Sequence, residues 1–192
     1  MAYNPNVHHR RSIRLKGYDY SQEGLYFVTI CVQNKQYLFG KIANREMILN
    51  TVGQMVKLCW LEIPQHFPNA VLHEYVIMPN HVHGIIELTN VGAKNFSPEN
   101  KSTNDFSPEN KSSNDDIRAK NFSPLQGTSR TIGSIIRGFK IGVTKQLGYS
   151  VWQRNFYEHI IRNESSYHNI TNYIVHNPAN WVEDKFYEPS QQ

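Results

Sequence analysis

The stretch AVLHEYVIMPNHVHGIIEL (residues 70–88) consists of two apolar, β-branched runs that meet at Pro79-Asn80. β-branched and aromatic residues favour strands, whereas a proline–asparagine pair favours a turn. The stretch therefore predicts two strands, 70–79 and 81–88, joined by a tight connection.

Two histidines, His81 and His83, lie on the second of these predicted strands. Residues two apart on a strand project from the same face, with Cα atoms about 6–7 Å apart. Such a pair can share a divalent transition metal; magnesium prefers oxygen ligands, which makes manganese the alternative that suits imidazole. A pair of partly exposed histidines, each hydrogen-bonded locally, explains the same spacing, so the pair alone does not decide between these interpretations.

Further strands and helices are predicted along most of the remaining chain. Apolar and β-branched runs predict strands at 25–32, 37–43, 45–50 and 151–161. Apolar residues at helical spacing predict helices at 51–67, 128–148 and 163–178. Pro64 marks the end of the first helix, Asn50 or Thr51 caps its start, and Asn163 caps the third. This order predicts an α+β domain with a mainly antiparallel central sheet and helices packed mainly on one face.

Residues 92–128 differ in composition from the rest of the chain. The segment AKNFSP occurs at 93–98 and again at 119–124, and FSPENKS is also repeated. Short polar copies of this kind cannot bury a core, so we expect a low-complexity, disordered insertion. The prediction is therefore a single domain over 1–192 that this insertion interrupts.

The composition restricts the class of protein. Hydrophobic residues make up 39% of the 192 residues, and there is no run of about 18 apolar residues that would predict a membrane span. The basic N-terminus lacks the apolar centre of a signal peptide. Cys31 and Cys59 lie in apolar sequence and are expected to be reduced core thiols. We therefore expect a cytoplasmic protein.

The formal net charge of +4 is small, but the cations are clustered. One cluster consists of Arg10, Arg11, Arg14 and Lys16, and the other of Arg130, Arg137, Lys140 and Lys145. Clustered cations suit a partner that carries phosphates, although an ordinary solvated surface has the same composition. The clusters alone do not identify such a partner, so support is needed from candidate catalytic or metal-binding residues.

The last predicted helix carries Tyr173 and Asn177, which lie four residues apart and therefore share one face. Tyr173 offers a phenolic nucleophile, and the side-chain carbonyl of Asn177 offers an oxygen ligand for a metal. Packing explains most tyrosines on short helices, and an asparagine before a proline is typical of a helix end. The chemical interpretation requires that this helix lies beside the histidine strand, which spacing cannot show.

Several of these segments resemble one protein family. VIMPNHVHGII (76–86) resembles the HUH motif of single-tyrosine HUH nucleases, in which two histidines flank a hydrophobic residue on a strand. WQRNFYEHIIRNE (152–164) and YIVHNPANW (173–181) resemble the C-terminal block of the REP-associated tyrosine transposase branch. RRSIRLKGYDYSQEGLYFVTICVQN (10–34) is similar to the start of that branch. The resemblance covers nearly the whole chain outside 92–128.

The resemblance implies a ferredoxin-like fold and a transposase that cuts single-stranded, often hairpin-associated DNA with magnesium or manganese. In that family a tyrosine attacks the phosphate, leaving a 5′-phosphotyrosine and a free 3′-OH, and a second transesterification rejoins strands. Carried over, Tyr173 is the catalytic tyrosine, and His81, His83 and Asn177 are the metal ligands. Both cation clusters and Arg154 become candidates for DNA contacts. The protein is then expected to be a monomer or homodimer that associates with the nucleoid when it acts.

Two other functions fit the same residues. A non-catalytic, domesticated or decaying relative would bind hairpin DNA without cutting it, and the repetitive insertion favours relaxed constraint. A small metallohydrolase or a replication initiator of the same nuclease superfamily would use the same histidines, but the chain has no phosphate-binding glycine loop. The complete set of His81, His83, Tyr173 and Asn177 favours the transposase over both.

Overall fold

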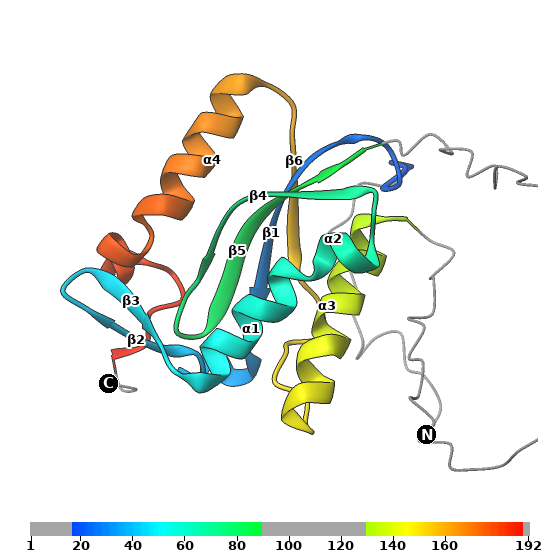
Figure 1. Ribbon diagram of the computed structural model, residues 1–192. Helices are drawn as coiled ribbons and strands as arrows, with labels where there is room; N and C mark the ends of the chain where they lie inside the picture. The colour runs from blue at the N-terminus through cyan, green and yellow to red at the C-terminus, as the bar shows by residue number, and fades with distance from the viewer. Residues whose placement is uncertain (1–16, 90–129, 190–192) are drawn as a thin grey trace, which may run out of the picture.

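The computed structural model describes residues 17–89 and 130–189, which together form a layered α+β structure (Figure 1). The predicted insertion at 92–128 lies outside the described residues. The same is true of the N-terminal cations Arg10, Arg11, Arg14 and Lys16. Within the two described ranges, no helix combines the length and the apolar character that a membrane crossing requires.

A four-stranded antiparallel sheet forms the centre of the fold. Its strands are β1 (Gly24–Cys31), β4 (Ala70–Ile77), β5 (His81–Leu88) and β6 (Tyr157–Ile161). They lie in the order β4-β5-β1-β6, so β5 and β1 are central and β4 and β6 are the edges (Figure 1). With helices after β1 and after β5, this is the strand order of a ferredoxin-like fold, and the predicted antiparallel α+β class is confirmed.

Most of the helices lie on one face of the sheet, as predicted. The helices of this face are α1 (Thr51–Leu61), α2 (Ile63–His66) and α3 (Ile132–Leu147), and the helix of the opposite face is α4 (Glu164–His176). Alternation along β1 separates the two layers, because Val28 and Ile30 join the core under α1 and α3, whereas Phe27 joins the smaller core under α4. The helix with Tyr173 and Asn177 therefore lies on the sheet face opposite α1 and α3.

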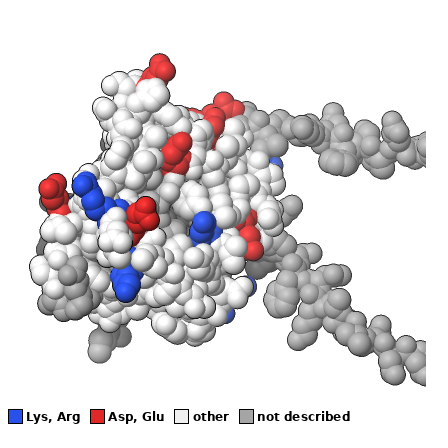
Figure 2. Space-filling view, turned by 60° about the vertical axis from the view of Figure 1, so that its left-hand side comes forward, with Lys and Arg blue, Asp and Glu red and all other residues white. Residues whose placement is uncertain are grey.

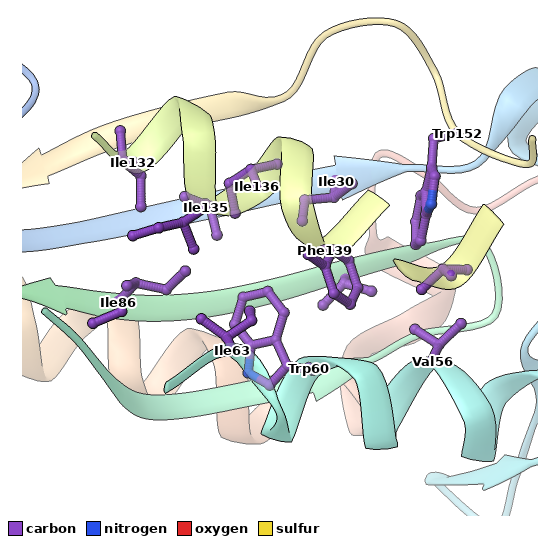
Figure 3. Packing of buried hydrophobic residues seen from close by; sticks show 14 of the residues in the cluster. Ile30, Val56, Trp60, Ile63, Ile86, Ile132, Ile135, Ile136, Phe139 and Trp152 are labelled. Atoms are coloured by element: carbon purple, nitrogen blue, oxygen red, sulfur yellow. The ribbon is translucent and has the colours of Figure 1, made fainter. Parts of the chain in front are cut away.

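The larger core is filled by the apolar stripe of α3 together with Val56 and Trp60 of α1 (Figure 3). Trp60 packs edge-on against Phe139, with ring centroids 5.3 Å apart. The Trp60 ring also lies against Gly84 of β5, where an added Cβ would overlap the indole. The glycine that follows the two histidines therefore lets the core tryptophan approach the strand, while the histidines project from the other face.

The predicted helix boundaries agree closely with the structure except at Pro64 and at the start of α3, which begins at Ile132 after its cap Thr131 and not at 128. Asn50 and Asn163 cap α1 and α4, and each side chain accepts a hydrogen bond from the backbone N–H three residues later, at 2.9 Å and 2.8 Å. The helix predicted over 51–67 is interrupted at Glu62. Pro64 lies in the first turn of α2 and does not end the helix, because a backbone N–H has no intrahelical partner at that position.

The remaining elements are short. They are η1 (Gln33–Lys35), β2 (Gly40–Ala43), β3 (Glu46–Leu49) and η2 (Pro178–Glu183). β2 and β3 pair with each other, so the strands predicted at 37–43 and 45–50 form a hairpin that is separate from the central sheet. The strand predicted over 151–161 shortens to β6, and Trp152 of its approach forms an isolated bridge with Val32.

Candidate metal and nucleophile site

His81 and His83 lie next to each other on the central strand β5. Their ring centroids are 4.4 Å apart, and the two residues are 0% and 1% exposed. Pairing with β1 and β4 holds the strand from both sides, and His83 is opposite Thr29 on one neighbour and Val76 on the other. The predicted common face is confirmed, whereas the alternative of partly exposed histidines is wrong.

A buried hydrogen bond orients each histidine ring. Nδ1 of His83 lies 2.8 Å from the Thr29 hydroxyl, and Nδ1 of His81 lies 2.8 Å from Oδ1 of Asn80. The Asn80 amide donates from Nδ2 to the carbonyls of Lys35 and Phe186, which fixes its oxygen toward His81. Because that oxygen can only accept, His81 carries its proton on Nδ1 and presents the lone pair of Nε2.

Burial keeps both imidazoles neutral. It lowers the pKa of His81 to about 3, and the ammonium of Lys185 adds to this effect. Burial and the neighbouring His81 hold the pKa of His83 well below its ordinary value, against the opposing effect of the Asp184 carboxylate. Neutral imidazole is the form that binds metal ions.

Helix α4 brings Tyr173 to this pair. The Tyr173 hydroxyl lies 3.1 Å from Nε2 of His83. Ile170 and Ile174 of the same helix pack with Phe27 in the smaller core and hold the helix on the sheet. Tyr173 is still 41% exposed, so a substrate can reach it. One chain therefore supplies the histidines and the tyrosine.

Asn177, one turn beyond Tyr173, is 3% exposed and lies at the end of α4. Its Nδ2 donates to Oδ2 of Asp184 at 2.9 Å. Its Oδ1 is buried and accepts no hydrogen bond from any described residue, and the same holds for Nε2 of His81. A buried hydrogen-bond acceptor without a partner costs folding free energy. These two atoms are therefore suited to bind a metal ion, which accepts their lone pairs.

Asp184 completes the cluster and was missing from the sequence prediction. Its Oδ2 accepts hydrogen bonds from Tyr173, at 3.2 Å, and from Asn177. One ligand atom each from His81, His83 and Asp184 lie within 4.8 Å of one another. Asp184 follows η2, which turns the chain back toward the sheet, so helical spacing from Tyr173 gives no signal for it.

The donor atoms of this cluster fit a divalent metal ion. Two imidazole nitrogens, one amide oxygen and one carboxylate oxygen make a mixed set that suits manganese better than magnesium, which prefers oxygen alone. The hydrogen bonds from Thr29 and Asn80 supply the outer contacts that orient metal-binding histidines. A His-His-Asp cluster that can hold a metal ion is therefore present, with Asn177 bonded to its carboxylate.

The phenol of Tyr173 is protonated in this arrangement. Burial raises the pKa of its hydroxyl, and the nearby carboxylate of Asp184 raises it further. One phenolic proton can serve either Asp184 or His83 at a given time. Deprotonation of Tyr173 therefore needs a nearby acceptor or a cation that compensates the new negative charge.

The described cations of the predicted DNA surface lie on several elements. Arg130, Arg137, Lys145 and Arg154 are exposed. Lys140 differs, because its ammonium donates to the carbonyls of Gln153 and Asn155 at 2.8 Å and 2.9 Å, and burial lowers its pKa to about 8. α3 packs on the sheet face opposite α4, so its cations are not adjacent to the histidine pair.

The face of the molecule drawn in Figure 2 has mixed charge. Blue and red side chains are interspersed there between broad uncharged areas, and the described residues form no continuous basic patch on it. DNA contacts by the exposed cations therefore stay a prediction.

Two Haemophilus influenzae proteins are similar in sequence to this chain, one closely and one distantly. The chain is 47% identical over 192 residues to an uncharacterised protein of Haemophilus influenzae, covering 96% of this chain and 97% of that one. It is 24% identical over 162 residues to a second Haemophilus influenzae protein, described as a candidate REP-associated tyrosine transposase, covering 84% of this chain and 73% of the other. No family model matches the sequence.

The fold is similar to that of a solved REP-associated tyrosine transposase bound to a REP hairpin. The TM-score is 0.53 at 21% identity, and the match covers 92% of this chain and 76% of that chain. By its full-length similarity, the chain belongs to one protein family with the first Haemophilus influenzae protein, and its fold is that of the REP-associated tyrosine transposase.

Proposed function

We propose that this chain is a single-tyrosine HUH transposase of the REP-associated branch, which cleaves and rejoins single-stranded, hairpin-associated DNA. The observation that carries the proposal is the Tyr173 hydroxyl 3.1 Å from Nε2 of His83. Beside it lie two buried atoms, Nε2 of His81 and Oδ1 of Asn177, that have no hydrogen-bond partner among the described residues. Support comes from the 24% identical relative and from the fold shared with a transposase that was solved with a REP hairpin.

The reaction is a transesterification at a DNA phosphate. The phenolic oxygen of Tyr173 bonds to phosphorus, the bond from phosphorus to the 3′ oxygen breaks, and that oxygen leaves as a 3′-OH after taking a proton. Asp184 accepts a hydrogen bond from Tyr173 at 3.2 Å and is placed to take the phenolic proton. The 5′-phosphotyrosine conserves the bond energy, so attack by a 3′-OH rejoins strands and releases Tyr173.

His81, His83 and Asn177 are the proposed metal ligands, and Asp184 is the proposed base beside them. A divalent ion bound there would polarise the scissile phosphate and stabilise its added negative charge. Thr29 and Asn80 orient the two imidazoles through hydrogen bonds, and the apolar contacts of α4 hold Tyr173 over them. Positioning and charge stabilisation supply most of the catalysis in phosphoryl transfer.

The proposed DNA contacts combine the exposed cations with the N-terminal cluster. Arg130, Arg137, Lys145 and Arg154 are free to reach backbone phosphates from the described part of the chain. Lys140 stabilises the chain before β6 through its two carbonyl contacts, which leaves it a smaller share in DNA binding than predicted. Arg10, Arg11, Arg14 and Lys16 complete the proposed set as a flanking arm.

A covalent adduct assay tests the proposal. The chain is incubated with manganese and a labelled hairpin oligonucleotide with single-stranded flanks, taken from inverted repeats beside its gene, and the adduct is resolved in a denaturing gel. We expect an adduct that Tyr173→Phe abolishes while DNA binding persists. Tyr149→Phe is the matched control, because Tyr149 is 57% exposed and follows α3.

Two results would contradict the proposal. An adduct that persists in Tyr173→Phe would show that another residue is the nucleophile. Hairpin binding without any adduct in the unaltered chain, in magnesium and in manganese, would favour the non-catalytic DNA-binding relative.

A further inference from the structure

A groove runs between α4 and the edge strand β6 on the sheet face that carries the histidines. α4 packs mainly against β4 and β5, and the groove lies beside it over the exposed Tyr157 and His159 of β6. The groove encloses about 450 Å³, within the range of about 300–1,000 Å³ for small-molecule sites. Its two walls, β6 and α4, diverge from the short connection that joins them (Figure 1).

The side chains of the groove offer aromatic faces and neutral hydrogen-bonding groups. Tyr157 and His159 project from alternate positions of β6, so both point to the same side. Ser166 and Asn169 line the opposite wall, and Phe27 of β1 contributes a third ring. Among the described residues that line it, no side chain is a carboxylate. This chemistry suits an uncharged, flat and polar-edged group and does not repel a neighbouring phosphate.

The groove leads to the nucleophile. Phe27 stacks on His83 with ring centroids 5.3 Å apart, and its ring is 6.2 Å from that of Tyr173. Ser166 and Tyr173 lie seven positions apart on α4, so the helix face that lines the groove continues to the hydroxyl. The exposed ammonium of Lys185 lies 5.7 Å from the ring centroid of Tyr157 and 4.9 Å from that of Phe186, a ring that in turn packs against His81.

We propose that this groove binds an unpaired nucleotide next to the phosphate that Tyr173 attacks. The base stacks on Tyr157 or His159, Ser166 and Asn169 contact its polar edge, and Lys185 contacts the linking phosphate. The choice of single-stranded DNA rests on the proposed function, whereas the location of the subsite rests on the groove itself. A base held this close to Tyr173 keeps the strand in register with the nucleophile.

Crosslinking and affinity measurements on the full chain test the subsite without relying on cleavage. The probe is a fluorescein-labelled 12-mer of thymidylate that contains 5-iododeoxyuridine, used with manganese. Irradiation followed by mass spectrometry is expected to place crosslinks at Tyr157 or His159. In fluorescence anisotropy, alanine at whichever of Tyr157 and His159 carries the base is expected to raise the Kd by roughly 5- to 100-fold, the range for loss of one stacked base. Annealing the probe to its complement is expected to weaken binding at least about tenfold.

Matched controls lie outside the groove. Tyr149→Ala removes an exposed tyrosine beyond α3, and His168→Ala removes a 64% exposed side chain from α4. Both are expected to leave the Kd within about twofold of the unaltered chain. Circular dichroism melting verifies that the groove variants are folded.

Three results would overturn the groove proposal: no binding of the 12-mer, crosslinks only at other residues, or a Kd that neither groove variant changes. The adduct assay on the hairpin oligonucleotide is a separate readout. An adduct at Tyr173 without groove crosslinks would refute the subsite and leave the transposase function standing. Groove crosslinks without an adduct would support the nucleotide subsite and contradict the proposed transposase function.

Discussion

The hydroxyl of Tyr173 lies 3.1 Å from Nε2 of His83, although the two residues are 90 positions apart in the chain. The contact joins the central strand β5 to helix α4, and Asp184 adds a third polar group from the following segment. The candidate nucleophile therefore lies beside the candidate metal ligands of its own chain, where charge added to a phosphate would be stabilised.

Removal of the two imidazoles should abolish metal binding. In the double variant His81→Ala, His83→Ala, the cluster keeps only Asp184 and the amide of Asn177, so we expect no measurable manganese binding in isothermal titration calorimetry. The control His66→Ala, His168→Ala removes two exposed histidines from α2 and α4 and should bind as before. Unchanged manganese affinity in the first variant would exclude this metal site.

Thr29→Val should weaken metal binding without unfolding the sheet. Thr29 is 1% exposed, and its hydroxyl is the described partner of Nδ1 of His83, at 2.8 Å. Loss of such an orienting contact costs about 10- to 100-fold in metal affinity. Thr29→Ser keeps the hydroxyl and should restore most of the affinity in the same calorimetric titration. Equal affinities for the serine and valine variants would mean that the hydroxyl does not orient the ring.

Asn177→Ala should weaken manganese binding at least about tenfold and reduce the Tyr173 adduct in parallel, because it removes a proposed ligand oxygen. Asn172→Ala is the matched control, since Asn172 is an exposed asparagine of the same helix. If metal affinity is retained while the adduct disappears, Asn177 positions Tyr173 or Asp184 and does not bind the ion.

Gly84→Ala should destabilise the protein, because the new methyl group would overlap the ring of Trp60. Overpacking of this kind costs about 1–3 kcal/mol, which thermal denaturation followed by circular dichroism can measure. Gly142→Ala provides the opposite case: its Cβ would meet no atom within 4 Å, and alanine favours a helix over glycine by about 0.5–1 kcal/mol. A melting temperature for Gly84→Ala at or above that of the unaltered chain would contradict the packing argument.

Local patterns were sufficient for most of the fold. Alternation and apolar spacing predicted the four strands of the sheet, the three long helices and the caps at Asn50 and Asn163, because these features depend on residues a few positions apart. Pro64 is an exception, because a proline can end one helix or lie in the first turn of the next, and the local pattern does not decide between these positions. The strands β2 and β3 were predicted too, but their separation from the central sheet was not, because strand partners are chosen by distant apolar surfaces.

The sequence by itself determined which side chains share a face: His81 with His83 on a strand, and Tyr173 with Asn177 on a helix. Only the tertiary structure decided that these two faces meet, because that contact depends on the packing of α4 against the smaller core. It also decided that Asp184 joins them, since η2 reverses the chain in a way that no periodic pattern encodes. Spacing specifies neighbours within one element, and burial of apolar surface brings separate elements together.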